Sequence, residues 1–279
     1  MVTERDLVLP DGRTLHLYDT GGPARLTVLW HHGTPNLGTP PPFPAAGIRW
    51  ISYDRPGYGT STPTPRRTVG DAAGWATAAA DALGVGRFAV MGHSGGSSHA
   101  LATAALLPDR VVAVASLAAV APFHDDGWFD GMASPGALKA ATAGRAAKEE
   151  YEAGAEFDPA VFTERDFAAL KGSQSWLDDV VQGALAGGIG GLVDDDLAYV
   201  SPWGADPARI AAPVLLLHGD DDRMVPAHHS AWLAGRCPRA ELRHAPGDGH
   251  LSVLGHAADA LAWLSDQDTS ASEATAGAM

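Results

Sequence analysis

One serine lies in a sequence context that suits nucleophilic catalysis. Ser94 is the central residue of GHSGG at positions 92–96, between an apolar run over 88–91 and a helix-forming stretch over 97–107. A serine attacks a carbonyl only if its hydroxyl is exposed beside a base, and a tight strand-to-helix turn provides that exposure. Glycines two positions before and after the serine relieve the backbone crowding of such a turn. The pattern predicts Ser94 as a nucleophile and the backbone N–H of Gly95 as a donor to the substrate oxygen.

Four other segments combine polar side chains with glycine or proline. They are HGTP at 32–35, DRPGYGTS at 54–61, HGDDDRMVP at 218–226 and GDGH at 247–250. Together with the serine turn, they resemble the motifs of the α/β-hydrolase superfamily in the same chain order. The resemblance covers about residues 5–265 and is weakest between 122 and 203. It implies the α/β-hydrolase fold and a serine-hydrolase reaction without a cofactor, but it does not identify the substrate.

The resemblance also implies an acid in the aspartate-rich segment. In the superfamily pattern the acid lies four residues before a proline, so Pro226 selects Asp222 from three consecutive aspartates. Some hydrolases carry the acid after an earlier strand, which leaves Asp125 as the alternative. The acid orients the base and stabilises its charged form.

The base and the second oxyanion donor are expected in two further loops. His250 lies in a glycine-rich loop after the last predicted strand and fits the position of the base. The backbone N–H of Thr34, in the HGTP segment, would be the second donor beside Gly95. His250 would take the proton of Ser94 during attack, and water would then cleave the acyl-enzyme with the same base.

Several reactions use a serine triad of this kind. Besides ester hydrolysis they include amide hydrolysis of the proline-iminopeptidase type, carbon–carbon bond hydrolysis and perhydrolysis. Gly95 disfavours the iminopeptidase interpretation, because those enzymes usually carry tryptophan after the serine. Haloalkane dehalogenases and epoxide hydrolases use an aspartate nucleophile, so Ser94 argues against both. A non-catalytic ligand-binding protein on the same fold is the alternative from another class.

Short apolar runs alternate with helical segments through most of the chain. A hairpin is predicted over 7–18, and further strands are predicted over 26–30, 48–53, 88–91, 111–117, 214–217 and 240–244. Helices are predicted over 72–83, 97–107, 227–234 and 256–264. This alternation indicates a mostly parallel sheet with helices on both faces and a site at one edge of the sheet.

The pattern changes between residues 122 and 203, where helical pieces rich in Trp, Phe and Gly replace the alternation. We expect a helical lid inserted into a core made of residues 1–121 and 204–265, followed by a disordered tail over 266–279. The large apolar residues of the lid either line an apolar substrate pocket or form the lid's own small core. The candidates are Phe123, Trp128, Phe129, Met132, Trp176 and Trp203.

The composition limits the possible partners. The formal net charge of −14 should repel nucleic acid and anionic membranes. The single cysteine, Cys237, excludes an internal disulfide and a zinc site of several cysteines, and no His-Glu-x-x-His string is present, so no metal is expected. No apolar run reaches the roughly 18 residues that span a bilayer. We therefore expect a cytoplasmic monomer or homodimer that acts on a small-molecule substrate.

Overall fold

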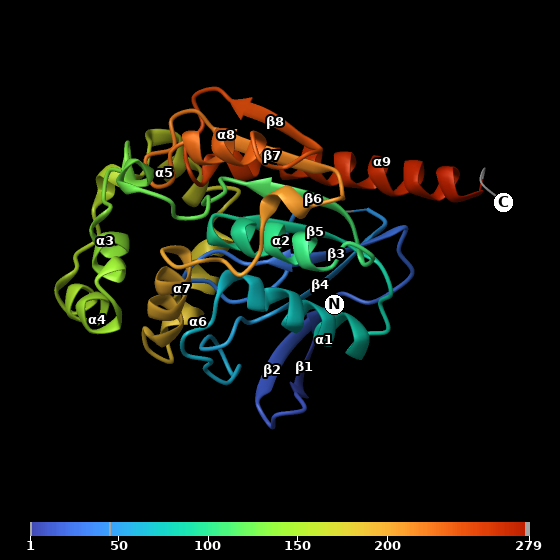
Figure 1. Cartoon of the computed structure of the whole chain (residues 1–279), viewed down its shortest axis with the longest axis horizontal. Helices are drawn as coiled ribbons and strands as arrows, with labels where there is room; N and C mark the ends of the chain where they lie inside the picture. The colour runs from blue at the N-terminus through green and yellow to red at the C-terminus, as the bar shows by residue number, and fades with distance from the viewer. Residues whose placement is uncertain (1, 45, 277–279) are drawn as a thin grey trace.

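An eight-stranded sheet forms the centre of the computed structural model, which describes residues 2–44 and 46–276 (Figure 1). The strand order is β1-β2-β4-β3-β5-β6-β7-β8. Strands β1 and β2 form an antiparallel hairpin, β2 is antiparallel to β4, and all other neighbouring strands are parallel. The strands are β1 (Thr3–Val8), β2 (Thr14–Asp19), β3 (Leu26–His31), β4 (Ile48–Tyr53), β5 (Phe88–His93), β6 (Val111–Leu117), β7 (Val214–Gly219) and β8 (Ala240–Ala245).

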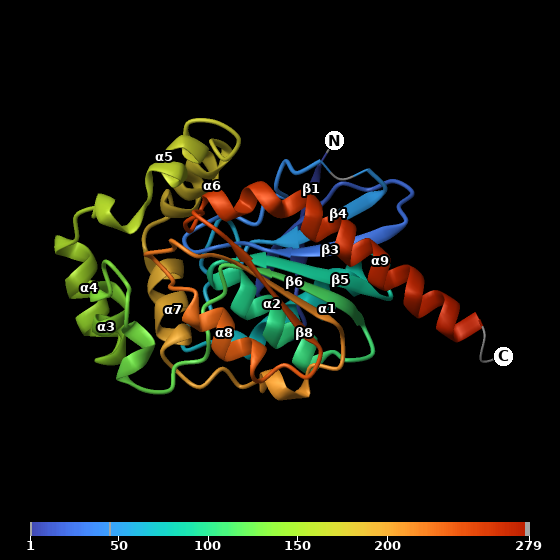
Figure 2. The same ribbon diagram turned by 90° about the horizontal axis from the view of Figure 1, so that it is seen from above.

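The central strands are apolar because both of their faces are covered. Every residue of β5, β6 and β7 is buried, and successive side chains enter opposite cores, as the pairs Val90 and Met91, and Val114 and Ala115, show. One core includes side chains of α1 (Ala72–Ala82), α2 (Gly95–Leu106) and α8 (His228–Ala234). The other includes α9 (Ala257–Ala276) and α6 (Trp176–Leu185) (Figure 2). The predicted mostly parallel sheet between helical layers is confirmed.

A helical insertion separates β6 from β7, within the range predicted for the lid. Figure 2 shows α3 and α4 as an outlying pair, whereas α5 and α6 lie closer to the sheet. The insertion consists of η2 (Asp126–Phe129), α3 (Gly136–Thr142), α4 (Arg145–Gly154), η3 (Pro159–Val161), α5 (Glu164–Leu170), α6 and α7 (Gly190–Tyr199). Three more short turns complete the chain: η1 (Val69–Asp71), η4 (Pro207–Arg209) and η5 (Ser252–His256).

The last helix is longer than predicted. The sequence indicates a helix to residue 264 and a disordered tail from 266, but α9 continues to Ala276 and projects past the sheet (Figure 1). Alanine and glutamate favour helix, and extending an existing helix needs no new nucleus, so these polar residues continue it. Residues 277–279 of the predicted tail lie outside the described part of the chain. Neither α9 nor any other helix among the described residues is long and apolar enough to cross a membrane.

Candidate active site

Ser94 occupies the sharp turn between β5 and α2. Its backbone has φ 56° and ψ −131°, a left-handed conformation that is strained for any residue with a side chain. A Cβ at Gly96 would lie less than 3.0 Å from the carbonyl of His31, and a Cβ at Gly92 would be equally close to the backbone of Gly96. The two glycines that mark this turn in the sequence are therefore required by the space around it.

Gly95 has a second reason to be glycine. A Cβ at this position would collide with the phenol ring of Tyr199, the last residue of α7 in the insertion. Sequence reasoning assigned Gly95 only a backbone N–H. The structure adds that the insertion packs directly on the turn that carries Ser94.

His250 and Asp222 form a buried pair between two loops. The Nδ1 of His250 lies 2.7 Å from Oδ2 of Asp222, and the other oxygen of Asp222 accepts the backbone N–H groups of Met224 at 2.9 Å and Val225 at 2.8 Å. Burial opposes ionisation of Asp222. The charge of His250, together with hydrogen bonds from His218 and His250, outweighs it and lowers the pKa of Asp222. Asp222 is thus a carboxylate that orients the imidazole.

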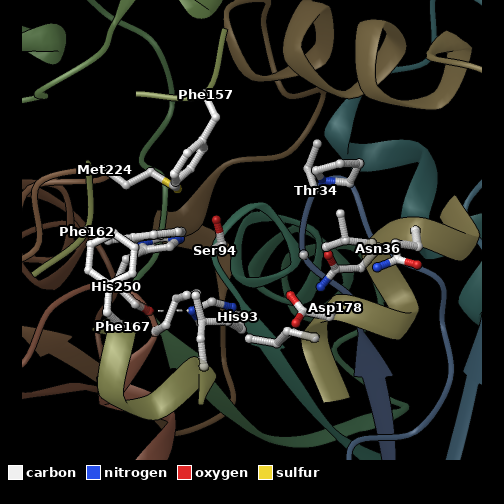
Figure 3. Close-up of a pocket in the computed structure, with 17 residues that line it drawn as sticks. Thr34, Asn36, His93, Ser94, Phe157, Phe162, Phe167, Asp178, Met224 and His250 are labelled. Atoms are coloured by element: carbon white, nitrogen blue, oxygen red, sulfur yellow. Dashed lines mark hydrogen bonds between the residues drawn. The ribbon is translucent and has the colours of Figure 1, made fainter. Parts of the chain in front are cut away.

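The same pair changes the basicity of His250. Burial disfavours the imidazolium, but the charge and hydrogen bond of Asp222, with a smaller contribution from Asp166, raise the pKa of His250. His250 and Ser94 line one cavity (Figure 3). Within the described residues no hydrogen bond joins the serine hydroxyl to the ring, as is common before a substrate binds.

His93 connects the serine turn to the histidine loop. Its Nε2–H donates to the backbone carbonyl of His250 at 2.7 Å. Burial and the neighbouring charge of His250 lower the pKa of His93 to about 3, so the ring is neutral near pH 7. The residue before Ser94 therefore contacts the loop that carries His250.

Asp125, the alternative acid, lies elsewhere. Its side chain is 68% exposed and accepts the backbone N–H of Gly127 at 2.9 Å, where it caps η2. The structure brings Asp222, and not Asp125, to His250.

Thr34 lies in a loop that buried charges hold in place. The guanidinium of Arg55 donates to the carbonyl of Gly33 at 2.9 Å and to the Thr34 hydroxyl at 3.0 Å, and it pairs with Asp195 of α7 at 2.6 Å. The Thr34 hydroxyl also donates to Asp195 at 2.6 Å. Arg67 contacts the second oxygen of this carboxylate. Arg55 of the DRPGYGTS segment and Asp195 of the insertion thus form an ion pair, and both contact the loop after β3.

The backbone N–H groups of Thr34 and Gly95 donate to no acceptor in the part of the chain that the structure describes. Thr34 lines the cavity, and Gly95 follows Ser94, which also lines it. Two backbone donors without a partner among the described residues therefore lie beside Ser94 and its cavity.

The cavity that contains Ser94 and His250 has a volume of about 550 Å³. Apolar side chains form much of its wall (Figure 3). Besides Ser94 and His250, the polar side chains that line it are those of Thr34, Asn36, His93, Asp178 and Gln182. The apolar wall includes Phe157, Phe162, Phe167, Leu170, Leu177 and Met224. The volume suits a small organic substrate.

The apolar residues that we expected to bind substrate require a correction. None of Trp128, Phe129, Met132, Trp176 and Trp203 is among the residues that line this cavity. All except Trp176 belong to the core between the sheet and its helices. Trp176 packs edge-on against Phe43, with ring centroids 6.0 Å apart. The segments that begin and end the insertion lead the chain to and from the sheet, so their side chains join the core.

The aromatic residues that do line the cavity come from the middle of the insertion. Phe157, Phe162 and Phe167 lie in and around η3 and α5. Residue type alone does not separate them from the buried aromatics, because the distinction depends on which face of each short helix meets the sheet edge.

Comparison with known proteins places the chain in a family. A family model for the alpha/beta hydrolase fold matches residues 20–257, so the protein belongs to the α/β-hydrolase fold family. It is similar to a pimeloyl-[acyl-carrier protein] methyl ester esterase of Aromatoleum aromaticum, with 32% identity over 35% of this chain and 37% of that protein. It is also similar to an epoxide hydrolase of Caballeronia sordidicola, with 35% identity over 42% of this chain and 37% of that protein. These matches span little more than a third of either relative.

The fold is also found in solved structures. A thermophilic esterase from Thermogutta terrifontis superposes with a TM-score of 0.70 at 21% identity, over 95% of this chain and 99% of that one. At this identity the likeness shows the fold alone. Family model and fold agree in placing the protein in the α/β-hydrolase fold family.

The buried charges around Asp195 give a stability prediction. We expect Asp195→Asn to lower the free energy of unfolding by about 3–5 kcal/mol, because the buried guanidinium of Arg55 would lose its countercharge and that of Arg67 would keep only Asp194, at 3.3 Å. Urea unfolding monitored by tryptophan fluorescence measures this change. Asp179→Asn, at an exposed position of α6, is the control for loss of one acidic charge. Equal unfolding midpoints for the two variants would contradict the prediction.

Proposed function

We propose that the protein is a serine hydrolase that cleaves a small ester with an apolar acyl or alcohol group, without a cofactor. The observation that carries the proposal is the placement of Ser94, on its strained turn, at the same cavity as the buried His250–Asp222 pair. A nucleophile, a base and an acid that orients the base are the parts that acyl transfer needs.

The geometry supports a two-step reaction. In the first step, Nε2 of His250 takes the proton of Ser94 while the serine oxygen adds to the ester carbonyl. The N–H groups of Thr34 and Gly95 stabilise the oxyanion, and loss of one such donor in a related reaction costs roughly 3 kcal/mol. The alcohol then leaves with the proton from His250. In the second step, water attacks the acyl-enzyme with His250 again as the base, and the acid and free serine are released.

The character of the cavity favours an ester over the alternatives. Its phenylalanine and leucine wall suits an apolar group, and the net charge of −14 disfavours a strongly anionic substrate. Amide hydrolysis, carbon–carbon bond hydrolysis and perhydrolysis can use the same triad, so a panel of those substrates is the comparison for any ester activity. Ser94 in place of an aspartate argues against the epoxide hydrolysis named for one relative.

The nucleophile is tested by substitution and by covalent labelling. We expect Ser94→Ala to lower kcat for p-nitrophenyl butyrate by on the order of 10⁴-fold or more, because no other group forms the acyl-enzyme. A fluorophosphonate probe should add to Ser94, as read by mass spectrometry of the digested protein. Wild-type hydrolysis by Ser94→Ala would refute the assignment, and an unlabelled Ser94 would favour a non-catalytic binding protein.

The acid is tested by a matched pair of substitutions. Asp222→Asn should lower kcat by on the order of 10⁴-fold, because the amide cannot hold the imidazole in the productive tautomer. Asp125→Asn removes the same charge from the exposed alternative and should leave kcat unchanged. The reverse ranking of the two variants would move the acid to Asp125.

The raised pKa of His250 predicts the pH dependence of hydrolysis. The base must be neutral in the free enzyme, so kcat/KM should rise with pH as His250 loses its proton. Asp222 raises the pKa of His250, and the midpoint of this rise should therefore lie above the ordinary histidine value of about 6.5. A pH profile of kcat/KM measures the midpoint, and a value below 6.5 would contradict the expected effect of Asp222.

The apolar wall predicts a preference for longer acyl chains. Each added methylene that is buried contributes up to about 0.8 kcal/mol, or roughly fourfold in kcat/KM, until the cavity is full. We expect kcat/KM to rise from p-nitrophenyl acetate to the hexanoate and Phe167→Ala to weaken this trend. Trp176→Phe, outside the cavity wall, should keep it. A flat chain-length series in the wild-type protein would show that the cavity does not bind the acyl group.

A further inference from the structure

A carboxylate of the insertion is buried beside the histidine loop. Asp166 lies in the first turn of α5 and has no exposed surface. One of its oxygens, Oδ2, accepts the backbone N–H of Thr163 at 2.9 Å and the Thr163 hydroxyl at 3.0 Å. The N–H of Asp166 donates back to that hydroxyl at 3.1 Å. This half of the carboxylate forms a reciprocal helix cap and explains how Asp166 is held.

The other oxygen faces the residues that follow His250. Oδ1 of Asp166 accepts the backbone N–H groups of Leu251 and Ser252, both at 2.8 Å. On the preceding side, a Cβ at Gly249 would lie less than 3.0 Å from the same carboxylate. Asp166 therefore contacts the chain on both sides of His250, although it is not itself among the residues that line the cavity.

Two independent contacts thus fix the backbone of the proposed base. From the sheet, His93 donates to the carbonyl of His250 at 2.7 Å. From the insertion, Asp166 receives the next two N–H groups. With the backbone held, the imidazole is free to move only by side-chain rotation, which its 2.7 Å contact with Asp222 restricts. A helix cap alone would not require these contacts to the loop.

The charge of Asp166 also affects the pKa of His250. Burial opposes ionisation, but the N–H groups of Thr163, Ser252 and Leu251 lower the pKa of Asp166, so it is a carboxylate at neutral pH. Its charge contributes to the raised pKa of His250, after the larger contribution of Asp222.

We propose that Asp166 is a positioning residue for His250, which makes the placement of the base depend on the helical insertion. The inference rests on the proposed function, because it assigns Asp166 to the orientation of the base of that reaction. It predicts that the insertion does more than enclose substrate: one of its side chains completes the support of the triad.

The test combines an NMR titration with kinetics. Asp166→Asn should lower the pKa of His250, because a nearby opposite charge is removed. Titration of ¹⁵N-histidine-labelled protein reads this pKa, with the His250 signal assigned by its loss in His250→Gln. The other groups that face the ring stay in place: Asp222 remains charged, and His93 remains neutral because its pKa is about 3. In p-nitrophenyl butyrate hydrolysis, kcat should fall by on the order of 10²-fold with KM little changed, as expected for a misplaced base.

Two control variants separate positioning from helix capping and from loss of charge. Thr163→Val removes the hydroxyl of the cap but leaves the carboxylate on the loop, so it should lower the melting temperature and keep the pKa of His250. Glu164→Gln removes one negative charge from the same turn at an exposed position and should change neither quantity. If Asp166→Asn matches Thr163→Val in the His250 pKa and in kcat, Asp166 is only a helix cap and the proposal is overturned.

A second variant approaches the same contact from the loop, in case Asp166→Asn does not fold. Gly249→Ala should push the loop away from the carboxylate and lower kcat, whereas Gly255→Ala, with no atom within 4 Å of the new methyl group, should not. The double variant Asp166→Asn/Gly249→Ala should be no less active than the less active of the two single variants, because both substitutions break the same contact. Additive losses, or wild-type kcat in Gly249→Ala, would overturn the proposal.

The titration also keeps this proposal separate from the proposed function. It is run in a Ser94→Ala background, where no hydrolysis is needed for the signal. If the wild-type protein hydrolyses none of the substrates while Asp166→Asn still shifts the pKa of His250, the proposed function fails and the positioning contact stands. If hydrolysis is present and Asp166→Asn leaves both the pKa and kcat unchanged, the positioning role fails alone.

Discussion

The crowded backbone around Ser94 constrains the rest of the molecule. The serine keeps its left-handed conformation, a strain of order 1–3 kcal/mol, in a turn whose crowded backbone leaves no space for a side chain at positions 92 and 96. Backbone support offsets that strain: the N–H of Ser94 donates to the carbonyl of Leu117 at 2.9 Å, and the Ser97 hydroxyl contacts two carbonyls at 2.8 Å. The same crowding brings the loop after β3 against α2 and brings Tyr199 of the insertion over Gly95. One turn therefore determines how closely three separate parts of the chain approach.

Three buried carboxylates hold the loops around this turn. Asp222 holds the ring of His250, Asp166 holds the backbone after it, and Asp195 holds the loop of Thr34. The pKa of each is lowered, because charged or N–H donors outweigh the cost of burial. A buried charge with incomplete partners would destabilise the fold, so each carboxylate specifies the position of the groups that complete it. Two of the three belong to the insertion, which is thereby part of the site's framework.

Features of the structure that depend on residues close together in the sequence could be predicted from it. The strands from β3 to β8 and the helix after Ser94 could be found because apolar runs and turn residues mark them. Gly92 is required by its contact with Gly96 within the turn, whereas the atoms that crowd Gly96 belong to His31 and His32. The roles of Asp166 and Asp195 could not be found in this way. Their partners are 85 and 140 residues away in the sequence, and both look like ordinary acidic residues of short helices. The aromatic wall of the cavity was missed for a related reason, since tertiary packing selects which rings face Ser94. The tail over 266–276 was missed because its polar composition hides good helix formers.

The pairing of Asp195 with Arg55 and Arg67 has a consequence for how the insertion can change. Helix α7 cannot leave the loop after β3 without exposing two bare guanidinium groups to a poorly solvated interior, which makes it the fixed part of the insertion. Ion pairs also tie α4 to this helix, because Arg145 pairs with Asp194 and the buried Lys148 pairs with Asp196 at 2.6 Å. Phe157 of the cavity wall follows α4 and is 67% exposed. Phe157 is therefore the part of the cavity wall that can change with the least effect on these ion pairs. A substitution at Phe157 can thus change the shape of the cavity while Asp166 and Asp195 keep their contacts to the two loops.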